Sequence, residues 1–211
     1  MLKMIIFDMD GVLVDACEWH KDALNEAMEE ICDFSLTEEE HEEHFNGLPT
    51  MVKLKKLAEM NDILPEHIPL IYELKQEKTK KVILEKATLD KSKIDLMVWL
   101  ENNNITACCF TNSIRETALM MLEKTGIKDS LEMIVTNQEV TQAKPHPEGY
   151  IKILEHFDIS PSEAFIVEDS PKGIKAAEAS GCKVMKVKNA TYVNTNSIKE
   201  FIDESFNSNG R

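Results

Sequence analysis

The sequence predicts an α/β protein with a doubly wound parallel-sheet (Rossmann-like) core and an inserted all-helical cap domain. From residue 82 onward, short apolar segments alternate with segments of helical periodicity, which is typical of a parallel sheet covered by helices on both faces. Residues 8–104 separate the first apolar segment from the second, whereas a crossover between parallel strands needs only about a dozen residues or somewhat more. We therefore expect a core of residues 1–14 and 82–211 and a cap of residues 15–81.

The predicted cap contains helices only. Its apolar residues recur at helical spacing, and no segment has the pattern of a strand. The expected helices begin after Asp15, at the capping box formed by Thr37 and Glu40, at Thr50, and near Leu70 in a last helix that continues to about Glu85.

The predicted core begins with the buried strand 4–7 and then alternates helix and strand. The expected strands are 105–110, 133–136, 164–167 and 184–187. The expected helices are 91–102 with Asp90 as N-cap, 115–126 with a capping box of Ser113 and Glu116, 147–157 with Pro147 in the first turn, 171–181 with Gly181 as C-cap, and 197–206.

The composition restricts the partners. The chain has 24 Lys and Arg against 38 Asp and Glu, a net charge of −14, which is the wrong sign for broad contact with nucleic acid or an anionic membrane. Five scattered cysteines without a CxxC pair indicate reduced thiols. No apolar run approaches the ~18 residues of a membrane span, and the N-terminus does not have a signal-peptide pattern. We expect a cytoplasmic protein; the sequence does not indicate its oligomeric state.

Polar groups follow three of the predicted strands at their carboxyl ends, where open α/β sheets bind ligands. A lysine between the second and last of these strands precedes two prolines, which keep it out of a regular helix. The groups are Asp8 and Asp10 after the first strand, Thr111 and Asn112 after the second, Lys144 before Pro145 and Pro147, and Glu168 and Asp169 after the strand at 164–167.

These residue types fit phosphoryl transfer. Carboxylates such as Asp8, Asp169 and Glu168 are hard oxygen ligands for Mg²⁺. Thr111 and Asn112 can donate to phosphate oxygens, and Lys144 can offset the charge of a transferring phosphoryl group. An ionised carboxylate at the strand end can attack phosphorus, and a second carboxyl can exchange protons with the leaving group and water. We expect Asp8 to be the nucleophile and Asp10 the acid/base.

The segments FDMDGVLVD, TNS, KPHPEGY and VEDSPKGIKAAEASG resemble the four motifs of the haloacid dehalogenase superfamily, in their usual order. The branch that the chain resembles has a helical cap and includes β-phosphoglucomutase and small-molecule phosphatases. The resemblance implies Mg²⁺ on Asp8, Asp169 and the Asp10 carbonyl, with Glu168 as a metal or second-layer residue. It also implies phosphate contacts from Thr111, Asn112 and Lys144.

The chain departs from the pattern of many relatives in one segment: it has ATLDKSKIDL where they carry a Pro-Gly pair.

Several other residues have a structural and a functional interpretation. We interpret His41 and His44 as part of a solvated acidic helix face rather than a metal site, because their spacing is not HExxH. Ser113 is interpreted as a helix cap. His20 matches a histidine at the cap entrance of β-phosphoglucomutase-like proteins. His20 and Lys75 are candidate substrate contacts. The default interpretation of Lys75, and of Lys53, is an ordinary solvated lysine.

The predicted function is a Mg²⁺-dependent phosphatase that hydrolyses a small phosphorylated metabolite, such as a sugar phosphate, through an aspartyl-phosphate. Two alternatives stay open. A phosphomutase of the β-phosphoglucomutase type would return the phosphoryl group to a second sugar hydroxyl. A catalytically silent regulatory or scaffold module would be expected to lack an essential carboxylate, yet the motifs are complete.

Overall fold

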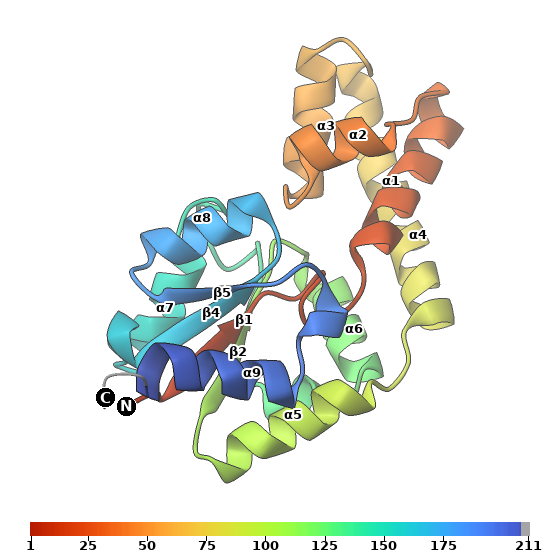
Figure 1. Ribbon diagram of the computed structural model, residues 1–211. Helices are drawn as coiled ribbons and strands as arrows, with labels where there is room; N and C mark the ends of the chain where they lie inside the picture. The colour runs from red at the N-terminus through yellow and green to blue at the C-terminus, as the bar shows by residue number, and fades with distance from the viewer. Residues whose placement is uncertain (208–211) are drawn as a thin grey trace. The chain divides into compact units, whose positions relative to one another are not determined.

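The computed structural model describes residues 1–207 and contains one parallel sheet of five strands in the order β3-β2-β1-β4-β5 (Figure 1). The sheet confirms the predicted α/β fold class with a helical insertion. The strands are β1 (Met4–Phe7), β2 (Thr106–Phe110), β3 (Met133–Val135), β4 (Ala164–Glu168) and β5 (Lys183–Lys186). The α-helices of this unit are α5 (Lys91–Asn102), α6 (Arg115–Lys124), α7 (Glu148–His156), α8 (Pro171–Ala179) and α9 (Thr195–Ile202).

Strand β1 lies at the centre of the sheet. All four of its residues are apolar, which suits this position, where they are fully buried. Its last residue, Phe7, pairs with Cys109 of β2 and Val167 of β4. Since the three strands are parallel and in this register, their carboxyl ends meet at one edge of the sheet.

Helices cover both faces of the sheet, as the alternation predicts. Helices α7 and α8 contribute Tyr150, Ile153 and Ala176 to a buried cluster with Met4 and Ile6 of β1. On the other side of the strands lie α5 and α9 (Figure 1), and Phe201 of α9 packs against Phe165 of β4 with ring centroids 4.8 Å apart.

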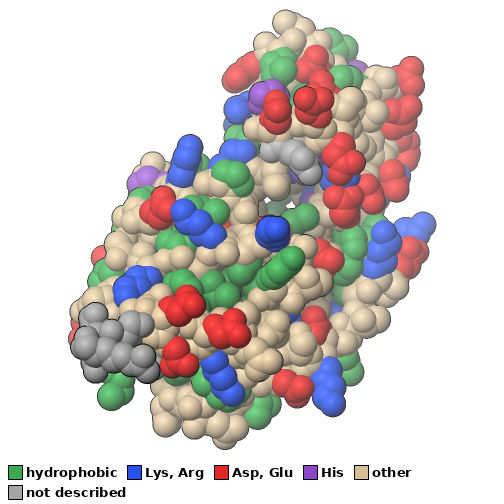
Figure 2. Space-filling model, viewed as in Figure 1, with side chains coloured by type: hydrophobic (Ala, Val, Ile, Leu, Met, Phe, Trp, Pro, Cys, Tyr) green, Lys and Arg blue, Asp and Glu red, His purple; other side chains and the backbone are tan. Residues whose placement is uncertain are grey.

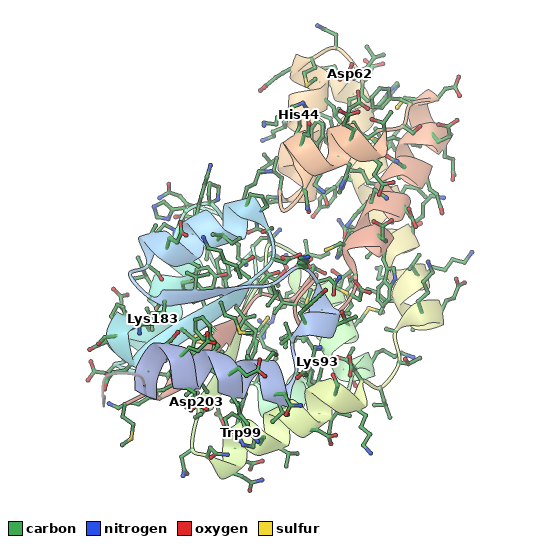
Figure 3. The ribbon with its side chains drawn as sticks, viewed as in Figure 1. His44, Asp62, Lys93, Trp99, Lys183 and Asp203 are labelled. Atoms are coloured by element: carbon green, nitrogen blue, oxygen red, sulfur yellow. The ribbon has the colours of Figure 1, made fainter. Side chains whose placement is uncertain are left out.

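One fully buried lysine links two distant parts of this unit. Lys93 lies on α5 (Figure 3). It donates to the carbonyl oxygens of Ala190 and Val193, each at 2.7 Å. Burial lowers the pKa of Lys93, and the two carbonyls supply acceptors that a buried ammonium requires. The bonds hold the segment after β5 against α5.

Contacts divide the chain into two compact units, one of Met1–Asp15 and Thr88–Arg211 and one of Ala16–Ala87. The described elements of the second unit are all helical: α1 (Cys17–Cys32), α2 (Glu38–Glu40) with a π-helical turn at His41–Phe45, α3 (Thr50–Glu59), a 3₁₀ turn at Pro65–His67, and α4 (Ile68–Lys86). Their buried cluster includes Leu24, Met28, Leu54 and Ile71.

Most predicted helix signals are present. Thr37 and Glu40 form the expected capping box, and Asp90 caps α5 by accepting from Ser92 N and Lys93 N. Pro147 is the N-cap of α7 rather than part of its first turn. Helix α8 ends at Ala179 with Ser180 as its C-cap, and Gly181 follows in a left-handed conformation at φ 83°. The predicted boundary after residue 81 falls inside α4, which has no helix breaker before Ala87.

The visible face of the molecule carries many acidic side chains (Figure 2), in agreement with the net charge of −14. Among residues 1–207, no helix is long and apolar enough to cross a membrane.

Candidate active site

The carboxyl ends of β1, β2 and β4 bring the predicted site residues together. Asp8 follows β1 directly, and its backbone N–H donates to Val167 O of β4 at 3.0 Å. Thr111 follows β2 and donates its N–H to Val135 O of β3 at 3.0 Å. Glu168 is the last residue of β4. The register of the strands therefore fixes the backbone positions of Asp8, Thr111 and Glu168.

Lys144 lies between two of the carboxylates. Its Nζ donates to Asp8 Oδ1 at 2.5 Å and to Glu168 Oε1, and its side chain is 3% exposed. Its backbone N–H donates to Asn112 Oδ1 at 3.2 Å, and the Lys144–Pro145 peptide bond is cis. The prediction that this lysine meets the strand ends is confirmed, although its observed partners here are carboxylates.

Glu168 is a fully buried carboxylate with donors on both oxygens. Oε1 accepts from Lys144 Nζ and from the Tyr150 hydroxyl at 2.7 Å. Oε2 accepts from Asp169 N at 3.1 Å and from N and Oγ of Ser170 at 3.3 Å. A buried charge needs such a set of partners. Gly173 makes room for it, because a Cβ there would lie 1.9 Å from Glu168 Oε1.

Asp10 is held by two hydroxyl groups from the end of β2. Its Oδ2 accepts from Ser113 Oγ at 2.8 Å and from Thr111 Oγ1 at 3.2 Å. The interpretation of Ser113 as a helix cap is wrong: α6 has Ile114 as N-cap without a side-chain cap, and Gln138 Oε1 accepts from Arg115 N instead. The local sequence pattern of a capping box is present, but the long-range partner Asp10 takes the hydroxyl.

The electrostatics of the site are those of crowded carboxylates. Burial raises the pKa of Asp8 well above its usual range; Glu168 raises it further, and Lys144 opposes both effects. Burial, followed by the nearby Glu168, raises the pKa of Asp169 to about 7. Burial lowers the pKa of Lys144, but the Asp8 and Glu168 carboxylates outweigh it and leave the lysine protonated. Extra positive charge would therefore be favourable here.

The donor set fits a hard divalent cation. Carboxylate oxygens of Asp8, Glu168 and Asp169 all lie within 4.8 Å of one another, and carboxylates are the ligands that Mg²⁺ prefers. Asp8 and Asp169 are the better candidates for direct ligation, because the oxygens of Glu168 already accept from neighbouring donors.

The helical unit contains two pairs of basic side chains. Lys75 Nζ lies 3.0 Å from His20 Nδ1, and Lys53 Nζ lies 3.3 Å from His41 Nε2. Lys53, Lys75 and His41 are buried, so the default of solvated side chains is wrong for these three. His44 is exposed, as predicted (Figure 3). These three side chains are buried because the helices pack against one another. The spacing of residues within one helix does not reveal such packing.

Sequence reasoning missed Tyr150 and gave Ser113 the role of a helix cap instead of a contact to Asp10. Tyr150 lies in the KPHPEGY segment on the buried stripe of α7. A buried tyrosine usually needs a partner for its hydroxyl, so its place on that stripe was an available signal. Ser113 had no comparable signal, because its partner Asp10 lies 103 residues away in the chain.

Comparisons with known proteins show what the whole chain is similar to. The model of the family described as haloacid dehalogenase-like hydrolase matches residues 5–187. A phosphorylated carbohydrates phosphatase of Thermotoga maritima is 26% identical over 180 residues, which are 85% of this chain and 82% of the relative. A phosphoglycolate phosphatase of Nitrosococcus oceani is 24% identical, over 87% of this chain and 82% of the relative. The crystal structure of a β-phosphoglucomutase from Clostridium difficile superposes with a TM-score of 0.83 at 23% identity, covering 99% of this chain and 98% of that one.

Proposed function

Because the chain belongs to the haloacid dehalogenase-like hydrolase family, we propose that it is a Mg²⁺-dependent phosphatase of small phosphorylated metabolites, with carbohydrate phosphates as the first class to test. The observation that carries this proposal is the position of Lys144. Its ammonium is buried beside Asp8 at the carboxyl ends of the strands, next to a cluster of three carboxylates. A fixed cation beside a carboxylate nucleophile is what phosphoryl transfer requires.

In this proposal Asp8 attacks phosphorus, the bond from phosphorus to the substrate oxygen breaks, and an aspartyl-phosphate forms. Asp10 gives a proton to the leaving oxygen and later takes one from the water that hydrolyses the aspartyl-phosphate. The hydroxyls of Ser113 and Thr111 orient the Asp10 carboxyl for both steps. Lys144 and Asn112 are assigned to the phosphoryl oxygens, and the bond from Lys144 N to Asn112 Oδ1 ties the two together.

Mg²⁺ would be held by Asp8 and Asp169, with Glu168 beside them and the Asp10 carbonyl as a further ligand. When bound, it supplies positive charge that offsets the charge of the phosphoryl group and keeps Asp8 ionised. Burial, and after it the neighbouring carboxylates, raise the pKa values of Asp8 and Asp169. This supports the assignment, because a bound cation would favour the ionised carboxylates.

The substrate class rests on the relatives. Those named above are called phosphatases of phosphorylated carbohydrates and of phosphoglycolate, and others are called pyrophosphatases. At 24–26% identity these names support a small phosphorylated compound as the substrate. His20 and Lys75, which contact each other in the helical unit, are proposed substrate contacts.

The test is a phosphate-release screen over sugar phosphates, phosphoglycolate and pyrophosphate, with Mg²⁺ and with EDTA. We expect Mg²⁺-dependent release from at least one member and none from Asp8→Asn. Incubation of β-glucose 1-phosphate with a bisphosphate primer separates the mutase alternative, which would give glucose 6-phosphate in place of free phosphate. Absence of turnover in both assays would overturn the enzymatic proposal and favour a silent module.

A further inference from the structure

Tyr150 of α7 is a buried residue whose hydroxyl binds Glu168, the carboxylate that also binds Lys144. The hydroxyl donates to Glu168 Oε1 at 2.7 Å, and the same oxygen accepts from Lys144 Nζ. The side chain is fully buried, so this bond supplies the partner that a buried hydroxyl needs. Burial raises the pKa of Tyr150 well above its usual value, which leaves the phenol protonated and a donor.

We propose that Tyr150 is a positioning residue that lets Lys144 move from Glu168 to a substrate phosphate. In the present arrangement Lys144 divides its hydrogen bonds between Asp8 and Glu168. The ammonium has three N–H groups, two of which are used in these bonds, and a phosphoryl oxygen that binds the third would draw the lysine away from Glu168. Glu168 Oε1 then keeps the tyrosine hydroxyl, so that the buried carboxylate oxygen retains a donor and the exchange costs less.

The rings around Lys144 support this role. Its Nζ lies 4.9 Å from the centroid of the Phe110 ring and 5.1 Å from that of Tyr150, distances at which aromatic faces attract a cation. The two rings pack edge to face with centroids 4.9 Å apart. Gly149 permits this packing, since a Cβ there would lie 2.4 Å from the Phe110 ring. The Tyr150 ring, and with it the hydroxyl, is therefore held in place by its packing against Phe110.

Without the hydroxyl, Lys144 would be the one remaining side-chain donor that the described residues offer to Glu168 Oε1. The carboxylate would then hold the lysine more strongly, and a phosphate would compete less well for it. Hydrogen bonds to charged groups are among the stronger ones in proteins. We expect Tyr150→Phe, which keeps the ring, to weaken phosphate binding about tenfold.

This inference rests on the proposed function, so the test measures binding and not turnover. Calorimetry gives the Kd of Mg²⁺ alone, and then the Kd of orthophosphate for the Mg²⁺-loaded protein. For Tyr150→Phe we expect an orthophosphate Kd about tenfold weaker and a Mg²⁺ Kd within about twofold of the unmodified chain. Tyr192→Phe is the matched control, because Tyr192 is half exposed on the same unit, and it should change neither value.

Each other outcome is informative. Equal phosphate affinities in Tyr150→Phe and the unmodified chain would overturn the positioning role. A parallel loss of Mg²⁺ and phosphate affinity, or failure of Tyr150→Phe to fold, would show that the hydroxyl supports the structure in general and would also overturn it. If the unmodified chain binds no orthophosphate in the presence of Mg²⁺, the proposed function itself fails.

Discussion

The Ser113 hydroxyl donates to Oδ2 of Asp10 at 2.8 Å, across 103 residues of sequence. The Thr111 hydroxyl donates to the same oxygen at 3.2 Å, and Thr111 Oγ1 also accepts from Ser113 N at 3.0 Å. The three residues form a short network that fixes the plane of the Asp10 carboxyl. A proton-transfer group held in this way has fewer orientations to search before each transfer.

The first prediction concerns this network. Ser113→Ala should lower kcat about tenfold, a part of the roughly 10²- to 10⁴-fold contribution of a general acid/base, because Asp10 loses one of its two orienting hydroxyls. Steady-state phosphate release gives kcat and KM. Ser92→Ala removes an exposed serine hydroxyl from α5 and should leave kcat unchanged. A normal kcat in Ser113→Ala would refute the orienting role.

The sequence predicts this fold well because its strongest signals are local and repeated. Buried apolar strands alternate with amphipathic helices, and parallel strands in register place Asp8, Thr111 and Glu168 at one edge. The positions of the carboxylates follow from that topology, whereas the position of Lys144 was predicted from the two prolines that follow it.

The partners of those side chains could not be predicted in the same way. Ser113 and Glu116 have the spacing of a capping box, yet Asp10 and Gln138 supply the actual bonds. Lys53 and His41 lie on different helices and meet through packing, which the periodicity of one helix cannot reveal. Hydrogen bonds over long sequence separations depend on tertiary packing, and such packing overrides local preference.

The second prediction tests the nucleophile. Asp8→Asn should lower Mg²⁺-dependent phosphate release by at least about a thousandfold, because an amide cannot attack phosphorus and is a poor metal ligand. Phosphate release at saturating substrate, with circular dichroism as the check on folding, measures this. Asp129→Asn, an exposed aspartate on the same unit, should retain full activity. Substantial activity in Asp8→Asn would move the nucleophile to another residue.

The third prediction is a pH dependence of the metal-free protein. Asp169 has an ordinary pKa of 3.8 and a folded-state pKa of about 7, raised mainly by burial. Between these two values the folded protein holds a proton that the unfolded chain has released, so stability falls as the pH rises. The free energy of unfolding in EDTA should decrease by up to about 1.4 kcal/mol per pH unit from this group.

Denaturant titrations between pH 4 and 8 in EDTA would measure this slope. Asp169→Asn should have a smaller slope, since an amide does not titrate, and Asp129→Asn should keep the slope of the unmodified chain. Mg²⁺ should stabilise the unmodified chain more at pH 8 than at pH 5, because the metal competes with protons for the carboxylate. An identical slope in Asp169→Asn would show that other groups cause the dependence.

The last prediction concerns the space that Gly173 leaves for Glu168. A Cβ at this position would lie 1.9 Å from Glu168 Oε1 and 2.1 Å from Oε2, so Gly173→Ala must displace the carboxylate. The displacement would break its bonds to Lys144 and Tyr150. We expect a loss of about 1–3 kcal/mol in the free energy of unfolding, as in overpacked cores, and a fall in kcat/KM of at least about 100-fold.

Gly181→Ala separates this local effect from the general cost of replacing a glycine. Gly181 has φ +83°, and a Cβ there would meet Pro161 at an ordinary 3.5 Å. Its substitution should cost about 1–2 kcal/mol through backbone strain alone and leave kcat/KM unchanged. Thermal unfolding and phosphate release on both variants would decide the matter. If Gly173→Ala lost stability but kept its kcat/KM, Lys144 would function although its partner Glu168 is displaced. Glu168 would then support the fold without positioning Lys144.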